Sequence, residues 1–332
     1  MKINLFFRNK NAGFSIGRVF EPISSELGKL HEVSNWYMPC HQSNVQAVLR
    51  NILYAKKVIQ KNAINHITGD IYYLCWFLPR KNLVVTVHDI GFYTTRRKNI
   101  KLFFKYIGWI LPLKRAEKVI FISETTKKVV LKHLKLREEQ MEVIWNPVSS
   151  EYRKTDKRFN KDKPVILHLG MGIQKNLRNL IPALKGIACH LRLVGVLRNE
   201  YKQLLEEYKI EYSCVSNLTD KEVVKEYANC DIVNFISWHE GFGMPIVEGQ
   251  ASNKPVVTSN ILPMAEIAGD GACLVDPYSQ QEIRNAYKRI IEDDNYRESV
   301  RIKGYENSKR FNVTEIAKQY LYVYCEILNT QL

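Results

Sequence analysis

Two carboxylates separated by a glycine-rich segment are the feature of the sequence with the clearest chemical meaning. Glu240 and Glu248 stand eight positions apart, and the residues between them read GFGMPIV. Glycines permit close approach of a backbone to a ligand, and Pro245 suits the first turn of a helix. We therefore expect a helix to begin here, with backbone N–H groups placed to bind a diphosphate and Glu248 placed to bind two vicinal hydroxyls, such as those of a ribose.

This segment resembles the E-x7-E element of the family 4 retaining glycosyltransferases (glycosyl transferases group 1), which have the GT-B fold. The resemblance continues through KPVVTSNILPMAEIAGDGACLVDP and extends over almost the whole chain. It implies a donor site for a nucleoside diphosphate sugar, in which Glu240 is also a catalytic residue. The residues that it assigns to donor binding here are Gly241, Phe242, Gly243, Met244 and Glu248.

A second segment, LHLGMGIQKNLRNLIPAL, resembles the part of the family's donor site in which a glycine turn precedes a phosphate-binding lysine. Gly170 and Lys175 occupy these two positions. The resemblance therefore implies that Lys175 binds the donor phosphates and takes part in catalysis. The family pattern has an arginine shortly after the first glycine, whereas Met171 follows Gly170 here. Arg178 and Arg198 are candidate substitutes, with a solvated helix position as the alternative for Arg178.

Further candidates stand at the carboxyl ends of predicted strands, where doubly wound folds build their sites. His88 ends the strand in NLVVTVHDIGFY and matches the family's catalytic histidine near the transferred sugar; a core histidine is the alternative. HITGDIYY supplies Gly69 and Asp70, and FSIGRVFEPISSEL resembles the loop and helix that place Gly17 near the donor phosphates. Gly69, Asp70 and Arg18 are the acceptor-side candidates.

The elements that must position these residues alternate regularly along the chain. Apolar, β-branched runs such as KINLFF, NLVVTVHD, PVILHLG and CDIVNFIS are separated by helical patterns. Continuous apolar strands joined by helices indicate parallel sheets that are covered on both faces. The 332 residues suit two domains, and a content of 45% hydrophobic and 25% charged residues excludes a disordered chain.

The domain boundary is expected in NPVSSEYRKTDKRFNKDKP, which is polar, charged and bounded by prolines. We expect an acceptor-side Rossmann-like domain over residues 1–155, a donor domain over residues 156–311 and a terminal helix over residues 312–332. The last segment has apolar residues at helical spacing, and Asn312 can cap its start. The resemblance implies that the two domains face a cleft and that the terminal helix crosses back onto the first domain.

The charge is distributed unevenly between the two halves. The formal net charge is +15, and residues 1–155 hold 26 Lys and Arg against 11 Asp and Glu, whereas the remainder holds 23 of each kind. Such an excess favours contact with a polyanion. In TTRRKNIKLFFKYIGWILPLKRAEK, basic ends enclose an apolar middle, which predicts contact with an anionic membrane surface. An ordinary amphipathic helix is the alternative, and no nucleic-acid-binding motif accompanies the charge.

Other features bear on the compartment. The start, MKINLFFRNKNAG, has an apolar run too short for a signal peptide, and no run of about 18 apolar residues follows. Seven cysteines without a CxxC pair indicate a reducing compartment. We expect a cytoplasmic protein that is peripheral on the inner face of the plasma membrane.

The expected function is retaining transfer of a hexose to a glycan or lipid-linked acceptor in bacterial surface polysaccharide synthesis. The resemblance implies that no metal and no cofactor are required. It also implies that the departing phosphate itself takes the acceptor proton, so that no side-chain nucleophile is needed. A catalytically inactive protein that binds a sugar nucleotide or an anionic polymer is the alternative. A 2-epimerase or a phosphorylase of the same architecture is a third hypothesis, although no lysine stands in a context typical of pyridoxal phosphate enzymes.

Overall fold

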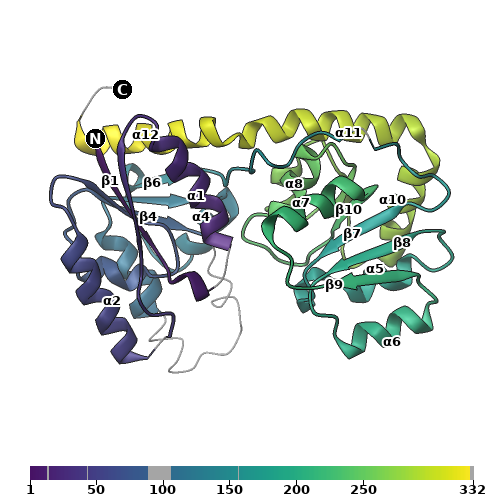
Figure 1. Cartoon of the computed structure of the whole chain (residues 1–332), viewed down its shortest axis with the longest axis horizontal. Coiled ribbons are helices and arrows are strands. Elements are labelled where there is room, and N and C mark those ends of the chain that lie inside the picture. Colours follow the sequence, from purple (N-terminus) through teal and green to yellow (C-terminus); the bar gives the residue numbers. More distant parts are fainter. Residues whose placement is uncertain (13–14, 43, 89–105, 156, 330–332) are drawn as a thin grey trace. The chain divides into compact units, whose positions relative to one another are not determined.

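The computed structural model describes residues 1–12, 15–42, 44–88, 106–155 and 157–329. Its contacts divide the chain into two compact units, each built around one sheet (Figure 1). Unit 1 comprises Met1–Pro147 and Val313–Leu332, and unit 2 comprises Val148–Asn312. The prediction of two parallel-sheet α/β domains is confirmed by the strand pairing in both units.

The boundary between the units lies earlier than expected, after Pro147 rather than after Thr155. Val148 forms a bridge with Asn312, and its N–H group donates a hydrogen bond to the Phe311 carbonyl at 2.8 Å. The start of the polar segment that suggested a linker therefore belongs to unit 2, because its backbone is paired there.

Unit 1 contains a six-stranded parallel sheet in the order β2-β1-β3-β4-β5-β6. Alternate residues of each strand enter different cores. Leu5 of β1 and Val84 of β4 pack on the face covered by α1 and α12, whereas Phe6 and Val85 pack on the opposite face with α2. The strands are β1 Lys2–Phe7, β2 Glu32–Tyr37, β3 Ile64–Ile67, β4 Leu83–Val87, β5 Lys118–Phe121 and β6 Met141–Val143.

Two helices of unit 1, α2 and α4, begin where the sequence supplies a capping side chain. The side chain of Asn44 accepts a hydrogen bond from the Ala47 N–H at the start of α2, and Ser123 does the same for Thr126 in α4. The α-helices are α1 Ser15–Leu27, α2 Val45–Val58, α4 Glu124–Leu131 and α12 Val313–Leu328, and shorter turns are η1 Lys10–Ala12, η2 Tyr72–Trp76, η4 Tyr106–Ile110, η5 Leu111–Arg115 and η6 Glu138–Gln140.

Helix α12 completes unit 1 beside α1 (Figure 1). Its Tyr324 hydroxyl lies 2.6 Å from Nδ1 of His66, whose Nε2 lies 2.8 Å from the Thr86 hydroxyl. Burial lowers the pKa of His66 to about 3, so the ring is neutral. The last helix thus contributes both apolar surface and a buried hydrogen bond to the first sheet.

The basic segment that predicted membrane contact is only partly described. Arg96, Arg97, Lys98 and Lys101 lie outside the described residues. From Tyr106 onward the chain forms the successive turns η4 and η5 rather than one amphipathic α-helix. Ile110 and Leu113 are buried in the core of unit 1, so part of the apolar middle serves packing.

Unit 2 contains a second six-stranded parallel sheet, in the order β12-β11-β10-β7-β8-β9. The strands are β7 Val165–Leu169, β8 His190–Val194, β9 Tyr212–Val215, β10 Ile232–Phe235, β11 Val256–Ser259 and β12 Cys273–Val275. The helices are α5 Leu177–Ala183, α6 Asn199–Glu207, α7 Asp220–Asn229, α8 Met244–Ala251, α9 Met264–Ala268, α10 Gln280–Glu292 and α11 Asp294–Ser308, with turns η7 Ile173–Lys175 and η8 Lys309–Phe311.

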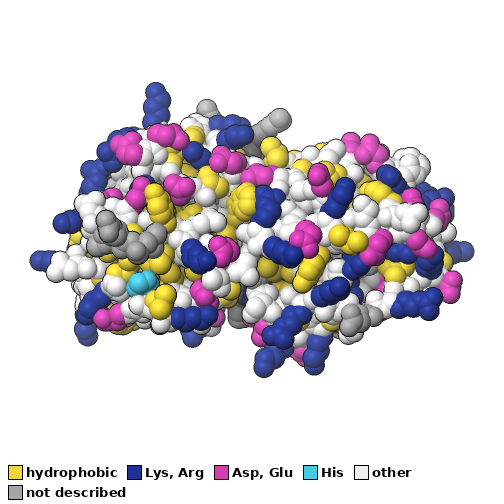
Figure 2. Space-filling view, turned by 90° about the horizontal axis from the view of Figure 1, so that it is seen from above, with side chains coloured by type: hydrophobic (Ala, Val, Ile, Leu, Met, Phe, Trp, Pro, Cys, Tyr) yellow, Lys and Arg dark blue, Asp and Glu magenta, His cyan; other side chains and the backbone are white. Residues whose placement is uncertain are grey.

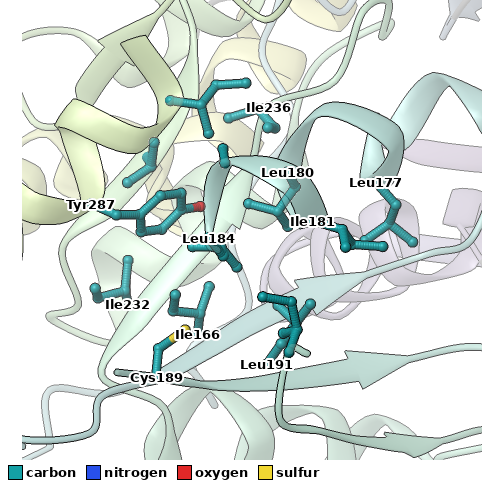
Figure 3. Close-up of a cluster of buried hydrophobic side chains, with 14 of the residues drawn as sticks. Ile166, Leu177, Leu180, Ile181, Leu184, Cys189, Leu191, Ile232, Ile236 and Tyr287 are labelled. Atoms are coloured by element: carbon teal, nitrogen blue, oxygen red, sulfur yellow. The ribbon is translucent and has the colours of Figure 1, made fainter. Parts of the chain in front are cut away.

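One face of this sheet carries a core formed with α5 and α10 (Figure 3). Leu180 of α5 and Leu184, which directly follows this helix, meet Ile166 of β7 and the ring of Tyr287 from α10. This packing fixes the carboxyl ends of β7 and β10, from which the predicted donor loops leave. Among the described helices of both units, none is long and apolar enough to cross a membrane.

Candidate active site

The loop between β10 and α8 requires a glycine at position 243. Gly243 has φ +120°, and a Cβ atom there would lie 2.9 Å from Cδ1 of Ile246. Any other residue would therefore be strained and crowded. Helix α8 starts at Met244 with Pro245 in its first turn, so its first N–H groups are not used inside the helix.

Lys175 and Glu240 meet directly beside this loop. The Lys175 Nζ lies 2.7 Å from Oε1 of Glu240 and 4.5 Å from the centre of the Phe235 ring. Only 18% of each side chain of the pair is exposed. An ammonium group held in this way is a preorganised partner for an anionic ligand, and the ring and the carboxylate restrict it to few rotamers.

The turn after β7 brings Lys175 to this position. Gly170 has φ +88°, and a Cβ atom there would lie 3.2 Å from Cε of Lys175. The N–H group of Trp238 donates to the Gln174 carbonyl at 2.9 Å, which joins the turn to the loop after β10. Two segments far apart in the sequence thus form one group of candidate donor-site residues in unit 2.

A buried chain of hydrogen bonds supports the Gly170 turn. The Tyr287 hydroxyl donates to Oδ1 of Asn234 at 2.5 Å, and Nδ2 of Asn234 donates to Nδ1 of His168 at 2.7 Å. Nε2 of His168 then donates to the Gly170 carbonyl at 2.9 Å. Burial, assisted by the charge of Lys175, lowers the pKa of His168 to about 3, which keeps one neutral tautomer. Sequence reasoning did not identify His168, Asn234 or Tyr287, because all three stand in patterns typical of buried elements.

Glu248 lies one turn into α8 and is almost entirely buried. Its Oε2 accepts a hydrogen bond of 2.5 Å from the hydroxyl of Tyr227 on α7. Burial, with a contribution from the Glu248 charge, raises the pKa of Tyr227 well above its usual value, so the tyrosine stays a donor. Tyr227 is a further residue that sequence reasoning missed, since its spacing in α7 indicates only a core position.

Two of the predicted donor residues differ in what they can present to a ligand. The side chain of Phe242 is buried, and its ring packs edge to face on Phe311 with centroids 5.8 Å apart. Phe242 can therefore contact a ligand only through its backbone. Met244, by contrast, is partly exposed at the start of α8.

The candidate substitutes for the missing arginine have other partners. Met171 is buried and packs against Gly195, where a Cβ atom would lie 3.0 Å from its Cγ. Arg178 and Arg198 both pair with Glu200 of α6, at 2.7 Å and 3.4 Å. Neither arginine is brought to the Lys175–Glu240 pair by these contacts.

In unit 1, the carboxyl ends of β3 and β4 bring His88 and Gly69 together. Nε2 of His88 lies 2.8 Å from the Thr68 carbonyl, so it carries the proton and donates it in a hydrogen bond. A Cβ atom at Gly69 would lie 2.9 Å from Cδ2 of His88 and 2.6 Å from Cδ1 of Ile16. Glycine at position 69 therefore permits α1, β3 and β4 to converge on the histidine.

Asp70 continues this group and is joined by a residue that sequence reasoning missed. It forms an ion pair with Arg8, which directly follows β1. The position of Arg8 at a strand end was the signal that could have identified it, but no glycine or motif marks it. The side chains of Asp70 and Arg8 are 33% and 16% exposed, so both reach the surface of unit 1.

Gly17 belongs to the helical part of its segment. It lies in the first turn of α1, next to Ile16, which contacts Gly69, while Arg18 is exposed. The ring of Phe20, one turn further, packs edge to face on His88 at 5.9 Å. The start of α1 is thus adjacent to the histidine, whereas residues 13 and 14 are not described. Among the described residues, no three His, Cys, Asp or Glu side chains gather as a metal-binding group.

Comparison with known proteins gives matches along most of the chain. The family model described as Glycosyl transferases group 1 matches residues 150–307, and that described as Glycosyltransferase Family 4 matches residues 18–152. The chain is 28% identical over 221 residues to the O-antigen chain mannosyltransferase RfbU of Salmonella typhimurium, spanning 63% of this chain and 61% of that protein. It is 25% identical over 291 residues to the O-antigen chain mannosyltransferase B of Escherichia coli, spanning 80% and 74%.

The fold is also shared with solved structures. The structure of Anabaena HepE in complex with UDP and glucose has a TM-score of 0.79 at 19% identity, covering 98% of this chain and 100% of that one. Two family models, one for each half, and a common architecture confirm the resemblance noted in the sequence. The chain therefore belongs to the family 4 glycosyltransferases, with the two parallel-sheet Rossmann-like domains of the GT-B fold.

Proposed function

We propose that this glycosyltransferase is a retaining hexosyltransferase that moves a sugar from a nucleoside diphosphate sugar to a glycan or lipid-linked acceptor in bacterial surface polysaccharide synthesis. The observation that carries the proposal is the Lys175–Glu240 pair, 2.7 Å apart at the glycine loop. The names of two relatives, both O-antigen chain mannosyltransferases, support the type of acceptor. The complex of HepE with UDP and glucose supports a nucleotide-sugar donor.

In the proposed donor complex, Lys175 and the first N–H groups of α8 bind the diphosphate. Both are fixed before the donor arrives, because the Gly170 turn holds the lysine and Gly243 holds the loop. Negative charge grows on the diphosphate as the bond to the sugar breaks, and preorganised donors stabilise that charge most when they need not reorganise. Glu240 keeps the Lys175 ammonium directed at the loop and lies on the side of the transferred sugar.

The proposed transfer needs no side-chain nucleophile, metal or cofactor. The acceptor hydroxyl attacks the anomeric carbon on the face from which the diphosphate departs, so that the configuration is retained. The bond from carbon to the acceptor oxygen forms while the bond to the phosphate oxygen breaks. The departing phosphate oxygen takes the acceptor proton, and the positive charge of Lys175 stabilises the leaving group.

Glu248 is proposed to accept hydrogen bonds from two vicinal hydroxyls of the donor ribose. Its burial makes such bonds strong, because a charged acceptor is poorly solvated by water there. Tyr227 holds Oε2 of the carboxylate, which orients the group before the donor binds.

In unit 1, His88 is proposed to contact the transferred sugar. The Nε2–H group of His88 donates a hydrogen bond to the Thr68 carbonyl. The other ring nitrogen, Nδ1, is therefore the acceptor that we propose for a sugar hydroxyl. Asp70, held by Arg8, is proposed to bind a hydroxyl of the acceptor or the sugar, and glycine at position 69 lets this strand end lie close to His88. At the start of α1, Arg18 is proposed to complete the acceptor-side group, and Gly17 is proposed to lie near the donor phosphates.

We also propose that the protein acts in the cytoplasm, as a peripheral protein on the inner face of the plasma membrane. The charge of residues 1–155 supports this location, because they contain 26 cationic residues and only 11 acidic ones. Growing surface glycans on lipid carriers would then be reached from an anionic bilayer surface, without participation of nucleic acid.

The test begins with a panel of nucleotide sugars and thermal unfolding. A ligand present at about 100 times its dissociation constant stabilises the folded state by about 2.7 kcal/mol, which is readily measured. Turnover of the best donor is then followed by release of the nucleoside diphosphate, and the proton coupling of the product's anomeric centre reports retention. Lys175→Met should abolish most turnover, whereas Lys163→Met, which breaks a Lys–Glu pair with Glu211 in the same unit, should not.

One observation favours the alternative of a catalytically inactive binding protein. Buried Met171 stands where the family has an arginine. If a nucleotide sugar stabilises the protein but no acceptor or water ever receives the sugar, the binding role replaces the proposed transfer. If no nucleotide sugar binds, both the proposed transfer and a sugar-nucleotide-binding role fail, and binding of an anionic polymer is the alternative that is left.

A further inference from the structure

The outer face of α2 is unusual for a helix that packs on a domain core. Val45, Leu49 and Leu53 follow one another at intervals of four residues and are 74%, 53% and 68% exposed. Buried positions of the same helix, such as Ile52 and Ala55, already fill the core below. Single exposed leucines are common, but a continuous row along a helix marks a contact surface.

Cations border this row. Arg50, Lys56 and Lys57 are exposed on the same outer side of α2, and no acidic residue occurs in the helix. We define the α2 face as these three cations together with Val45, Leu49 and Leu53.

An aromatic extension adjoins the carboxyl end of the α2 face. The Lys56 Nζ lies 5.7 Å from the centre of the Phe77 ring, and Phe77 is 44% exposed. The neighbouring Trp76 donates its Nε1 proton to the Ile107 carbonyl at 2.9 Å, and both side chains are also exposed. Aliphatic, aromatic and cationic groups therefore lie together, which is the composition of helices that bind at a membrane interface.

We propose that the α2 face is the surface by which this protein binds an anionic lipid bilayer, with Val45, Leu49 and Leu53 in the acyl boundary. The proposal deepens the proposed function by locating its membrane contact, and it rests on that function for the choice of partner. Of the basic segment considered in the sequence, Ile107 adjoins this surface, while residues 96–105 are outside the described structure.

Charge complementarity selects a bilayer rather than a second copy of the chain. Two α2 faces opposed to each other would bring six cations together without an acidic partner from either helix. On the opposite side of the sheet, the face shown in Figure 2 mixes Lys and Arg with Asp and Glu side chains. The α2 face differs from it by combining an apolar row with cations alone.

Vesicle co-sedimentation tests the proposal with the whole chain and no donor. The probe is phosphatidylcholine containing one quarter phosphatidylglycerol, at low and raised salt. The wild type should bind these vesicles and not pure phosphatidylcholine, with affinity falling as salt rises. Leu49→Gln with Leu53→Gln should lower the partition coefficient at least tenfold, because glutamine keeps the helix but does not enter the acyl boundary. Arg50→Gln with Lys56→Gln and Lys57→Gln should lower it about a hundredfold, since each cation is worth about a factor of five.

Matched controls separate this surface from general charge and hydrophobicity. Leu30→Gln with Val196→Gln removes two aliphatic side chains elsewhere that are even more exposed, at 83% and 73%. Replacement of three exposed helix lysines of unit 2 by glutamine removes the same charge; these are Lys221, Lys288 and Lys303. Both control variants should bind vesicles like the wild type. Loss of binding in a control equal to the loss in the α2 variants overturns the proposal.

Three other outcomes also overturn it. The first is a wild type that ignores anionic vesicles at low salt. The second is an α2 double variant with wild-type partition and an unchanged circular dichroism spectrum. The third is a wild-type dimer that the double variant dissociates while vesicle binding persists, which would assign the face to a second copy. Thermal stabilisation by UDP or GDP is measured in parallel, so that failure of the donor site and failure of the membrane contact are read independently.

Discussion

The hydroxyl of Tyr227 donates a 2.5 Å hydrogen bond to Oε2 of Glu248, and both side chains are buried between α7 and α8. The tyrosine therefore acts through the carboxylate rather than on a ligand. Its role in orienting Glu248 can be separated from a general packing role, because removal of one oxygen atom leaves the ring in place.

Tyr227→Phe should weaken donor binding about fivefold to tenfold, about 1–1.4 kcal/mol, because the carboxylate loses one hydrogen bond that orients it but keeps its contacts to the ribose. Glu248→Ala should weaken it further, by about 1.5–3 kcal/mol, because the ribose contacts disappear as well. Calorimetric titration with the donor measures both. Tyr320→Phe is the control, since Tyr320 is equally buried but lies in unit 1. Equal donor affinity in Tyr227→Phe and wild type would show that Tyr227 only packs.

The Lys175–Glu240 pair should affect turnover more than binding. Lys175→Met should lower kcat by about 10² to 10³, the usual effect of removing a group that stabilises charge in the transition state. Glu240→Gln should also lower kcat while leaving the thermal stabilisation by nucleoside diphosphate largely intact. Single-turnover kinetics distinguish these effects. If both variants turned over the donor at the wild-type rate, like the reference Lys163→Met, the Lys175–Glu240 pair would not take part in the reaction.

His88→Ala should lower transfer while leaving nucleotide affinity intact, because the proposed partner of His88 is the sugar. Gly69→Ala provides an independent approach, since its Cβ atom would lie 2.9 Å from Cδ2 of His88 and displace the ring. Crowding of this kind costs about 1–3 kcal/mol of stability. The informative measurement is specific activity per folded molecule. A lower melting temperature with unchanged specific activity in His88→Ala would identify a core histidine.

Arg8 and Asp70 should act as one unit on the acceptor side. Arg8→Met and Asp70→Asn should each raise the KM for the acceptor, and the double variant should be no worse than the more affected single variant, because the partners are in direct contact. The dissociation constant of the nucleoside diphosphate should not change. An altered nucleotide affinity with an unaltered acceptor KM would contradict this assignment.

Two buried histidines should make stability depend on pH. Burial lowers the pKa of His66 and of His168 to about 3 in the folded protein, against 6.5 for an ordinary histidine. Between these values the unfolded chain binds more protons than the folded one, so stability rises with pH and reaches its full value above about 6.5. Each histidine should contribute a slope of about 1.4 kcal/mol per pH unit inside that window.

Chemical unfolding at pH 5 and pH 7.5 checks this dependence. The difference in unfolding free energy between the two pH values should shrink in His66→Gln and in His168→Gln, whatever their absolute stability. The exposed His239→Gln is the control and should keep the wild-type difference. An unchanged difference in both core variants would refute the linkage.

Much of the fold was predictable because its signals are local. The apolar runs of β4 and β10 have the length and composition of buried parallel strands, and the glycines at 170 and 243 stand where a positive φ is required. The pairing of Lys175 with Glu240 joins two such loops, each of which is recognisable in sequence.

The remaining features depend on packing between distant segments, which leaves no local pattern. Sequence patterns indicate only core positions for Tyr227, Asn234 and Tyr287. The folded chain shows which polar atom each of these side chains hydrogen-bonds. Phe242 stands in the predicted ligand-binding motif. Its ring is nevertheless buried and packs on the ring of Phe311, which lies far along the chain. The boundary after Pro147 likewise follows from the bridge between Val148 and Asn312, which composition cannot reveal.

The position of α12 has a consequence for the order of events during synthesis. Tyr324 and Tyr320 cover His66 and the α1 side of the unit 1 sheet, yet they are translated after the whole of unit 2. While the second half of the chain is still being translated, the first half is an incomplete domain in which α1 alone covers one face of the sheet. Completion of the first domain therefore waits for the last helix, and unit 2 has the opportunity to fold first.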